Sequence, residues 1–362
     1  MASNKKRIYG GKSEADSSIF PDPFSRFKAY LFGFTAAALG AAALFGQTPS
    51  KPAEPSTVTT SGYSSIQEPE SKNTVPKINL KNKNTLDTKL NDWYSLSPSE
   101  LKKEMFQGQA WLEKAVMKRV DDFVNAEALN RQYRAKGEKR YQQTLKDLET
   151  IFSRLTTYKD YITDVHKSTG WPLPILYGMT FRESESRHDA YSPGGDAGLW
   201  QISYATGKDL GLIRGNKDYR FDPKESSEKI KVLLNELNSI YGNKHHLKIA
   251  AYNQGPNRTS RNIIEGRPWT PHVREHVVTI MAAAYINALS KDYGISIRKM
   301  PLYSDKLKEA YPVKIETTKT LGDLARKYGK PESEIAFLNP VILNPQNTRS
   351  LIAAGQYIKL PK

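Results

Sequence analysis

Apolar residues recur at spacings of three and four between residues 97 and 300, which predicts a long series of helices. The run Ser97-Pro98-Ser99-Glu100 precedes the series and is typical of a helix N-terminus, because a serine side chain can cap free N–H groups. Two buried faces are predicted, one from Leu101, Met105, Trp111, Leu112, Ala115, Val116 and Val120, the other from Leu145, Leu148, Ile151, Phe152 and Leu155. We therefore expect an all-helical domain over residues 97–300.

The pattern changes after Tyr311. Residues 313–317 have the composition of a short strand, two helical segments follow at 321–328 and 332–338, and residues 356–360 again indicate a strand. This order predicts a small βααβ module over residues 311–362. The expected fold class is mainly α, with this module at the C-terminal end.

Residues 27–46 are apolar apart from Lys28 and are long enough to cross a bilayer as a helix. The basic leader, residues 1–26, is expected to stay in the cytoplasm. A cleaved signal peptide is the competing interpretation, because residues 41–43 are small. Both interpretations export everything after residue 46, either on an inner-membrane anchor facing the periplasm or free in the cell envelope. Residues 47–96 are rich in Pro, Ser, Thr, Lys and Asn, which predicts a disordered linker.

The chain has 54 Lys and Arg against 38 Asp and Glu, a net charge of +16 that suits an anionic partner such as a bacterial wall polymer. No nucleic-acid-binding motif accompanies the charge, so we predict no nucleic-acid partner. The absence of cysteine excludes disulfides, thiolate catalysis and thiolate metal sites. No cofactor is expected, and protein partners are left open.

The segment from Arg182 to Ser203 carries the candidate chemistry. Glu183 closes an apolar helical run, and a Pro/Gly-rich loop leads to Gly198-Leu199-Trp200-Gln201. Cleaving a glycosidic bond requires a carboxylic acid that protonates the leaving oxygen, and an apolar setting favours the protonated form. We predict that Glu183 is such an acid at the edge of a sugar-binding groove.

Two motifs resemble those of the soluble-lytic-transglycosylase family. The first is Glu183-Ser184 with Ala190, Ser192-Pro193, Gly195 and Gly198-Leu199-x-Gln201. The second is Ala251-Tyr252-Asn253-Gln254-Gly255-Pro256, some fifty residues later, and the similarity runs over residues 161–293.

The resemblance implies a lysozyme-like helical catalytic domain that cuts the β-1,4 bond between N-acetylmuramic acid and N-acetylglucosamine in peptidoglycan glycan strands. Glu183 would be the general acid and then the base, and the muramyl 6-hydroxyl would attack to leave a 1,6-anhydro end. By the same resemblance, Ser192, Gln201, Tyr252, Asn253 and Gln254 would bind substrate.

Two alternatives concern a second carboxylate and catalysis itself. Glu185 is two residues from Glu183 and points to nearly the opposite side of a helix, but Asp189 and Asp196 lie in the following loop. If one of them activates a water, the enzyme is a lysozyme-type hydrolase. A non-catalytic wall-binding or assembly protein with the same fold is the other alternative.

Four positions depart from the family pattern: Ser186 replaces a common aromatic residue, Asp196 a small one, and His272 and His276 a Glu and a Tyr. The run His272-Val273-Arg274-Glu275-His276 also matches a short zinc motif of peptidases. We interpret the two histidines as surface or groove residues, and predict no metal site.

The C-terminal module resembles a LysM module through Leu321, Asp323-Leu324-Ala325, Leu338-Asn339-Pro340 and Gly355-Gln356. Its first turn departs from that pattern at Thr318-Lys319-Thr320. The resemblance implies glycan binding beside Thr320, Leu321 and Asn339.

Overall fold

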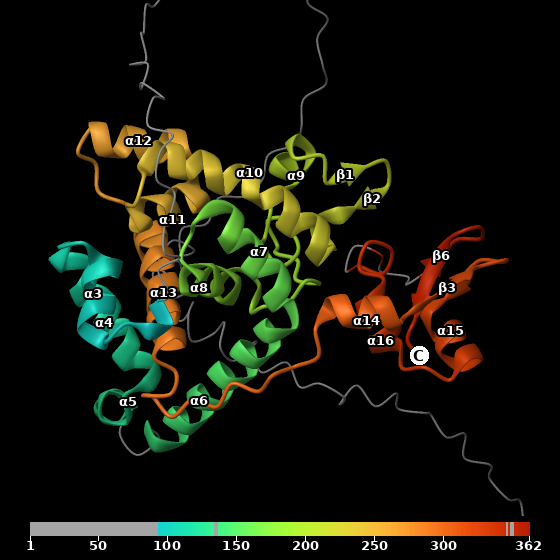
Figure 1. Cartoon of the computed structure of the whole chain (residues 1–362), viewed down its shortest axis with the longest axis horizontal. Coiled ribbons are helices and arrows are strands. Elements are labelled where there is room, and N and C mark those ends of the chain that lie inside the picture. The colour runs from blue at the N-terminus through green and yellow to red at the C-terminus, as the bar shows by residue number, and fades with distance from the viewer. Residues whose placement is uncertain (1–92, 134–136, 345–346, 348–350) are drawn as a thin grey trace, which may run out of the picture. The chain divides into compact units, whose positions relative to one another are not determined.

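The computed structural model describes residues 93–133, 137–344, 347 and 351–362. The predicted leader, the apolar segment 27–46 and the linker up to residue 92 lie outside the described residues. Within the described ranges, no helix is both long and apolar enough to span a bilayer. The described part is mainly α-helical, as expected (Figure 1).

Helices make up most of the described chain between residues 93 and 309. They are η1 (Trp93–Ser95), α3 (Pro98–Phe106), α4 (Ala110–Val124), α5 (Ala126–Tyr133), α6 (Gly137–Leu155), η3 (Thr156–Tyr158), α7 (Lys159–Thr169), α8 (Leu173–Ser184), α9 (Tyr204–Asp209), η4 (Tyr219–Phe221), α10 (Pro223–Tyr241), α11 (His245–Gln254), α12 (Pro256–Ile264), α13 (Pro271–Ala288) and α14 (Tyr303–Glu309). A short antiparallel pair, β1 (Ile213–Arg214) and β2 (Lys217–Asp218), interrupts them, with Ile213 opposite Asp218.

The predicted capping run at the start of α3 is confirmed. The Ser97 hydroxyl accepts a hydrogen bond from the Glu100 N–H, and the Glu100 carboxylate accepts one from the Ser97 N–H at 2.9 Å. These two bonds satisfy N–H groups that a helix start leaves free.

The first predicted buried face is largely confirmed, but Trp111 is not buried. Leu101, Met105, Leu112, Val116 and Val120 are buried, whereas Trp111 is 38% exposed and stacks edge-on against Trp269. The reason is a break between the helices: α3 ends at Phe106, and the next residue, Gln107, has a left-handed φ of 48°. The buried face of α4 therefore does not continue the helical spacing of α3, and Trp111 lies beside that face.

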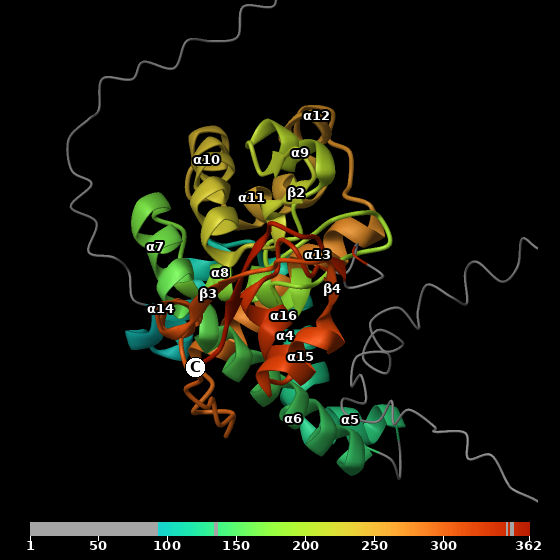
Figure 2. The ribbon, with the colours of Figure 1, turned by 90° about the vertical axis from the view of Figure 1, so that its right-hand side faces the viewer.

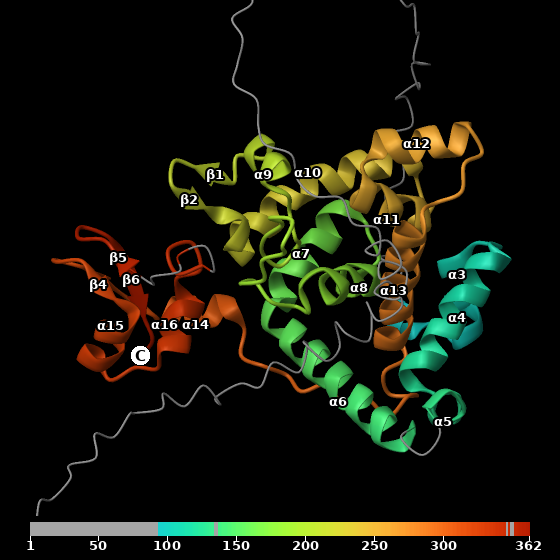
Figure 3. The same ribbon diagram turned by 180° about the vertical axis from the view of Figure 1, so that it is seen from behind.

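Helix α13 forms the centre of the helical part. Most of its side chains are buried all round, including Val277, Ile280, Met281 and Ala284. It packs against both α8 and α4, and Figures 1 and 3 show it between these two helices. Such burial on every side fits the apolar sequence of α13, which has no polar stripe.

Helices α8 and α13 approach each other closely at Gly178. A Cβ atom added at Gly178 would lie 2.3 Å from the backbone oxygen of Ile280. Only glycine admits this distance, because real Cβ contacts are longer. The short side chain thus sets the separation of the two helices on which the candidate site is built.

The C-terminal module follows the predicted βααβ order, with one addition. Strand β3 (Tyr311–Lys314) pairs antiparallel with β6 (Tyr357–Leu360), and α15 (Leu321–Tyr328) and α16 (Glu332–Leu338) lie between them in sequence. A second pair, β4 (Lys319–Thr320) and β5 (Leu351–Ile352), was not predicted. Helix α16 packs against β6 and α15 against β4, around a core that includes Ile315, Leu324, Ile335 and Ile358 (Figure 2).

Candidate active site

Glu183 lies in the last turn of α8, where its side chain is 15% exposed. The helix ends because Glu185 and Ser186 both adopt left-handed conformations, with φ of 56° and 58°. The Ser186 N–H then donates to the Thr180 carbonyl at 2.9 Å and the Glu185 N–H to the Phe181 carbonyl at 3.1 Å. This pattern closes a helix C-terminus. The prediction that Glu183 ends an apolar helix is confirmed.

The loop after α8 turns tightly around Gly198. Ala197 bridges Tyr191 on one side and Ile202 on the other. Gly198 has a φ of 81°, and a Cβ added there would lie 1.8 Å from the Arg220 backbone oxygen. Glycine is required here both by the backbone conformation and by the lack of space.

The Gln201 side chain holds this loop closed. Gln201 is itself left-handed, with φ of 47°, and its Nε2 donates to the carbonyl oxygens of Ala190 at 3.1 Å and Gly198 at 3.0 Å. Both protons of the amide are therefore used within the loop, and the side-chain oxygen is left for other contacts.

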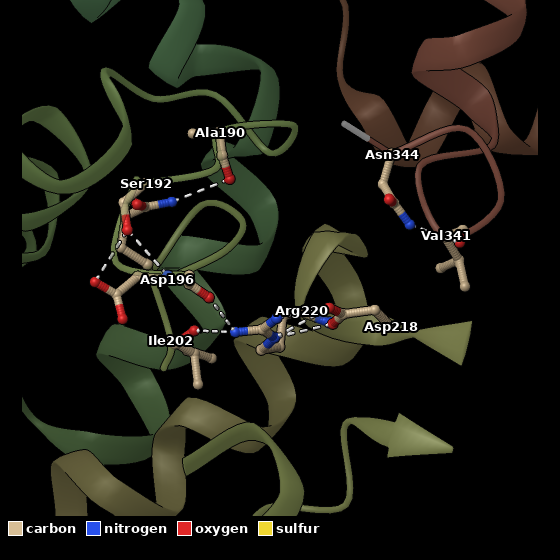
Figure 4. A network of polar contacts seen from close by, with 10 residues as sticks. Ala190, Ser192, Asp196, Ile202, Asp218, Arg220, Val341 and Asn344 are labelled. Atoms are coloured by element: carbon tan, nitrogen blue, oxygen red, sulfur yellow. Dashed lines mark hydrogen bonds and ion pairs between the residues drawn. The ribbon is translucent and has the colours of Figure 1, made fainter. Parts of the chain in front are cut away.

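A buried arginine, Arg220, also holds this loop in place. Arg220 is 1% exposed, and its Nη2 lies 2.7 Å from the Asp218 Oδ2. Its Nη1 donates to the carbonyls of Gly195 and Ile202, each at 2.8 Å, as Figure 4 shows. A guanidinium can serve both partners at once because it presents five N–H groups in one plane. Sequence analysis missed Arg220.

Ser192 and Asp196 pair at the rim of the loop. The Ser192 hydroxyl accepts from the Asp196 N–H at 2.9 Å and donates to the Asp196 Oδ2 at 3.2 Å (Figure 4). Asp189, the other candidate carboxylate, forms an exposed ion pair with Arg187 at 3.1 Å. Asp196 is therefore the loop carboxylate that the structure holds in a defined position beside Ser192.

Tyr252 joins α11 to the loop. Its hydroxyl donates a hydrogen bond to the Trp200 carbonyl at 2.6 Å. Burial raises the pKa of this hydroxyl well above its ordinary value, and the negative charges of Glu183 and Asp196 raise it further. The tyrosine is thus a permanent donor, and its surroundings include both carboxylates. Tyr252 is thus close enough to Glu183 for that charge to act on its hydroxyl, and its role in substrate binding stays a prediction.

Asn253 and Gln254 follow at the end of α11, both partly exposed. The Gln254 amide donates to the Thr259 hydroxyl at 2.9 Å, and its buried Oε1 has no hydrogen-bond partner among the described residues. Helix α11 ends at Gly255, whose φ is 88°. A substrate-binding role for these two residues stays a prediction.

His276 makes a direct contact that sequence analysis did not predict. Its Nε2 lies 3.2 Å from the Glu183 Oε1, and the residue is 2% exposed. Of the two interpretations of His276, surface residue or groove residue, burial excludes the first, because α13 turns this position toward α8. A place at the edge of the groove stays a prediction. His272, four residues earlier, is exposed, with its ring centroid 6.5 Å from that of His276.

The zinc alternative finds no support in the arrangement of side chains. Glu275, the glutamate of the short motif, pairs with Arg119 at 2.7 Å. In the part of the chain that the structure describes, no three His, Asp or Glu side chains are grouped so that they could hold a metal ion.

The residues predicted for glycan binding in the C-terminal module make internal contacts. Thr320 caps α15 through Asp323, and Leu321 is in the module core. Asn339 is buried, donates to the carbonyls of Ile335 and Lys359 and accepts from the Lys359 N–H. These contacts explain how the module is held together, and glycan binding stays a prediction.

Comparison with known proteins assigns the region around Glu183 to a family. A model described as "Transglycosylase SLT domain" matches residues 160–267. Two curated relatives, both named membrane-bound lytic murein transglycosylase D and both from strains of Escherichia coli, are 24% identical over 238 residues, 62% of this chain and 51% of each relative. The chain thus spans about half the length of these relatives.

Among solved structures, an inactive mutant of the lytic transglycosylase Slt from Pseudomonas aeruginosa matches with a TM-score of 0.36 and 19% identity, over 56% of this chain and 37% of that one. The family match includes Glu183, the loop that Arg220 holds and residues 252–254, and it ends before His276. Residues 160–267 of this chain are therefore similar to a transglycosylase SLT domain.

Proposed function

We propose that this protein is a peptidoglycan lytic transglycosylase with Glu183 as its catalytic acid and base. The observation that carries the proposal is the setting of Glu183. Its carboxyl is largely buried, it lies in the region that matches an SLT domain, and its charge raises the pKa of the Tyr252 hydroxyl. The name of the two curated relatives, lytic murein transglycosylase, supports the same activity.

The proposed reaction proceeds in two proton transfers. Glu183 donates its proton to the oxygen that links N-acetylmuramic acid to N-acetylglucosamine, and the bond from that oxygen to the muramyl anomeric carbon breaks. The Glu183 carboxylate then takes the proton of the muramyl 6-hydroxyl as this oxygen bonds to the anomeric carbon. The products are a free N-acetylglucosamine 4-hydroxyl and a 1,6-anhydro muramyl end, and Glu183 is again protonated.

The loop and α11 are proposed to form the two sides of the sugar groove. Ser192 and Gln201 lie on the loop side, where hydrogen bonds to Asp196, Ala190 and Gly198 fix them. Tyr252, Asn253 and Gln254 lie on the α11 side. A groove with rigid walls suits a polymer substrate, because little order has to be created when the strand binds.

Attachment to the membrane is proposed from residues 27–46, with the catalytic domain in the periplasm. The printed name of the relatives, membrane-bound, is consistent with an envelope location. The net charge of +16 would hold such an enzyme close to the anionic wall polymer.

Lysozyme-type hydrolysis is the second candidate, and Asp196 is the observation that favours it. Its charge, like that of Glu183, acts on the Tyr252 hydroxyl. A second carboxylate facing the same site is what activation of a water requires.

One digestion experiment separates these functions. Purified peptidoglycan is incubated with the wild type, Glu183→Gln and Asp196→Asn, and the product ends are identified by mass spectrometry. We expect anhydromuramyl ends from the wild type and from Asp196→Asn, and at most about a thousandth of the activity from Glu183→Gln. Reducing muramic ends that disappear in Asp196→Asn would establish hydrolysis. Full activity in Glu183→Gln would remove this residue from the mechanism, and no cleavage by any variant would leave a binding or assembly role.

A further inference from the structure

The His276 imidazole touches the proposed catalytic carboxyl from outside the matched SLT region. The two atoms concerned, His276 Nε2 and Glu183 Oε1, are 3.2 Å apart. The side chains are 3% and 15% exposed, so the contact lies largely out of water. An imidazole can present an N–H to a carboxyl oxygen, which makes this position chemically significant.

Packing of the two helices creates the contact. Gly178 lies five residues before Glu183 on α8, and Ile280 lies four residues after His276 on α13. Because Gly178 meets the backbone of Ile280, the two helices run in opposite directions here, and Glu183 is brought beside His276. The contact therefore depends on a close backbone approach between two buried helices and not on a surface side chain that can move away.

The His276 Nε2 has no partner with hydrogen-bond geometry among the described residues. It is close enough to the Glu183 oxygen, but the direction of approach is unsuitable. A buried N–H without a partner is costly, so such atoms are rare in folded proteins and often belong to functional sites. Catalytic hydrogen bonds are also commonly misaligned before substrate binds.

Other charged groups around the pair are placed differently. On α8, Arg182 precedes Glu183. On α13, His272 is exposed and Glu275 is paired with Arg119. On α11, the Tyr252 hydroxyl is close enough to Glu183 and to Asp196 for both charges to raise its pKa. Of these groups, the imidazole of His276 is the one that the structure places in direct contact with a Glu183 oxygen.

We propose that His276 is a positioning residue for Glu183, an inference that rests on the proposed function. The neutral imidazole donates its Nε2–H to Oε1, so the other oxygen, Oε2, carries the proton to the sugar and later takes one back. After the first transfer the same N–H faces the new carboxylate and stabilises it. His276 itself gains and loses no proton in the cycle.

Three variants test this. His276→Leu removes the donor, His276→Gln supplies an amide N–H in its place, and His272→Gln is the matched control on the same helix. Initial rates on soluble glycan strands give kcat and KM. We expect His276→Leu to lose about 10²–10³ in kcat with KM little changed, which is the usual loss on removal of one such donor. His276→Gln should stay within about tenfold of the wild type, and His272→Gln should match the wild type.

Equal losses of kcat in His276→Leu and His276→Gln would overturn the proposal and leave His276 a packing residue. So would wild-type kcat in His276→Leu. If His276→Leu does not fold, His276→Gln decides: a loss of about 10² or more in kcat, despite its amide N–H, would overturn the proposal. An active Glu183→Gln would refute the proposed function itself, whereas an inactive Glu183→Gln beside a fully active His276→Leu would refute only the role of His276.

Discussion

The Ser184 hydroxyl donates a hydrogen bond to the Leu199 carbonyl over 2.7 Å and so ties the end of α8 to the Gly-Leu-Trp-Gln turn. The residue after Glu183 thereby fixes the distance between the candidate acid and the loop that forms one side of its groove. The same hydroxyl lies 3.1 Å from the Thr180 carbonyl within α8, and the residue is buried.

Replacing Ser184 by alanine should loosen this connection. The Leu199 carbonyl would lose its donor in a buried place, at a cost of about 1–3 kcal/mol in the free energy of unfolding. We expect the peptidoglycan-cleaving activity to fall more than the stability implies, because the loop position changes relative to Glu183. Urea unfolding and initial rates at saturating substrate measure the two effects, and an unchanged rate would show that the loop is held without Ser184.

Ser186 is the matched contrast, two residues away. It is fully buried, yet its Oγ has no hydrogen-bond partner among the described residues. Ser186→Ala removes this unsatisfied oxygen, and alanine has to adopt the same left-handed backbone conformation as serine. We therefore expect the free energy of unfolding to stay level or to rise by about 1 kcal/mol. Thermal unfolding of both serine variants side by side tests this, and a loss in Ser186→Ala equal to that in Ser184→Ala would reveal a partner at Oγ.

Gly178→Ala should push α8 and α13 apart. The new Cβ would meet the Ile280 backbone oxygen at 2.3 Å, and overpacking of this kind costs about 1–3 kcal/mol. Because the same interface brings Glu183 to His276, kcat should fall as well. Gly322→Ala on α15 is the control: its Cβ would meet only side-chain atoms, at 3.2 Å or more, and alanine favours a helix. Equal stability of the two variants in urea unfolding would contradict this account.

Local signals in the sequence predicted the elements well where the cause is local. The cap at Ser97 and the bounds of α15 and α16 depend on residues within one turn, and the structure has them as expected. Glu183 could be found because it closes an apolar helix before a Gly-rich loop. Helix α14 was not predicted, since its seven residues are too few and too polar to show a buried face.

Contacts between distant parts of the chain could not be predicted. Arg220 lies in a polar stretch and gives no sign of burial, because its partners are carbonyl groups 18 and 25 residues away. The His276 contact depends on how α13 crosses α8, and a helix-start motif in the sequence carries no information on that crossing. These are the two features of the site that only the folded chain provides.

Breaking the Arg220 network should disorder the loop more than any surface change. Arg220→Met keeps most of the apolar stem but leaves the carbonyls of Gly195 and Ile202 without their donor, and loss of one partner of a buried ion pair costs about 3–5 kcal/mol. Arg214→Met is the control, since its pair with Glu225 is 46% and 37% exposed and should contribute about 1 kcal/mol or less. Similar unfolding midpoints for the two variants would mean that Arg220 does not hold the loop.

The stability of the protein should depend on pH through His188, which lies in the segment from Arg182 to Ser203. The residue is buried, and burial lowers the pKa of its imidazole to about 4. Its Nδ1 lies 2.7 Å from the Tyr158 hydroxyl. Burial also raises the pKa of that hydroxyl, so tyrosine is the donor and the neutral imidazole accepts.

The sign follows from linkage. In the unfolded chain His188 takes up a proton below about pH 6.5, but in the folded protein it resists until about pH 4. Between these values the unfolded state binds more protons. The stability contribution is therefore complete above about pH 6.5, is lost as the pH falls toward 4, and amounts to about 3 kcal/mol.

His188→Gln tests this contribution, because its amide oxygen can still accept from Tyr158 and does not titrate. The free energy of unfolding, measured in urea from pH 7 to pH 4, should fall by about 3 kcal/mol less in this variant than in the wild type. The pKa of both His245 and His246 is lowered by burial as well, so the difference between the two curves isolates His188. Tyr158→Phe keeps the titrating ring and should retain the wild-type slope. Parallel curves for the wild type and His188→Gln would place the pH dependence on the other histidines.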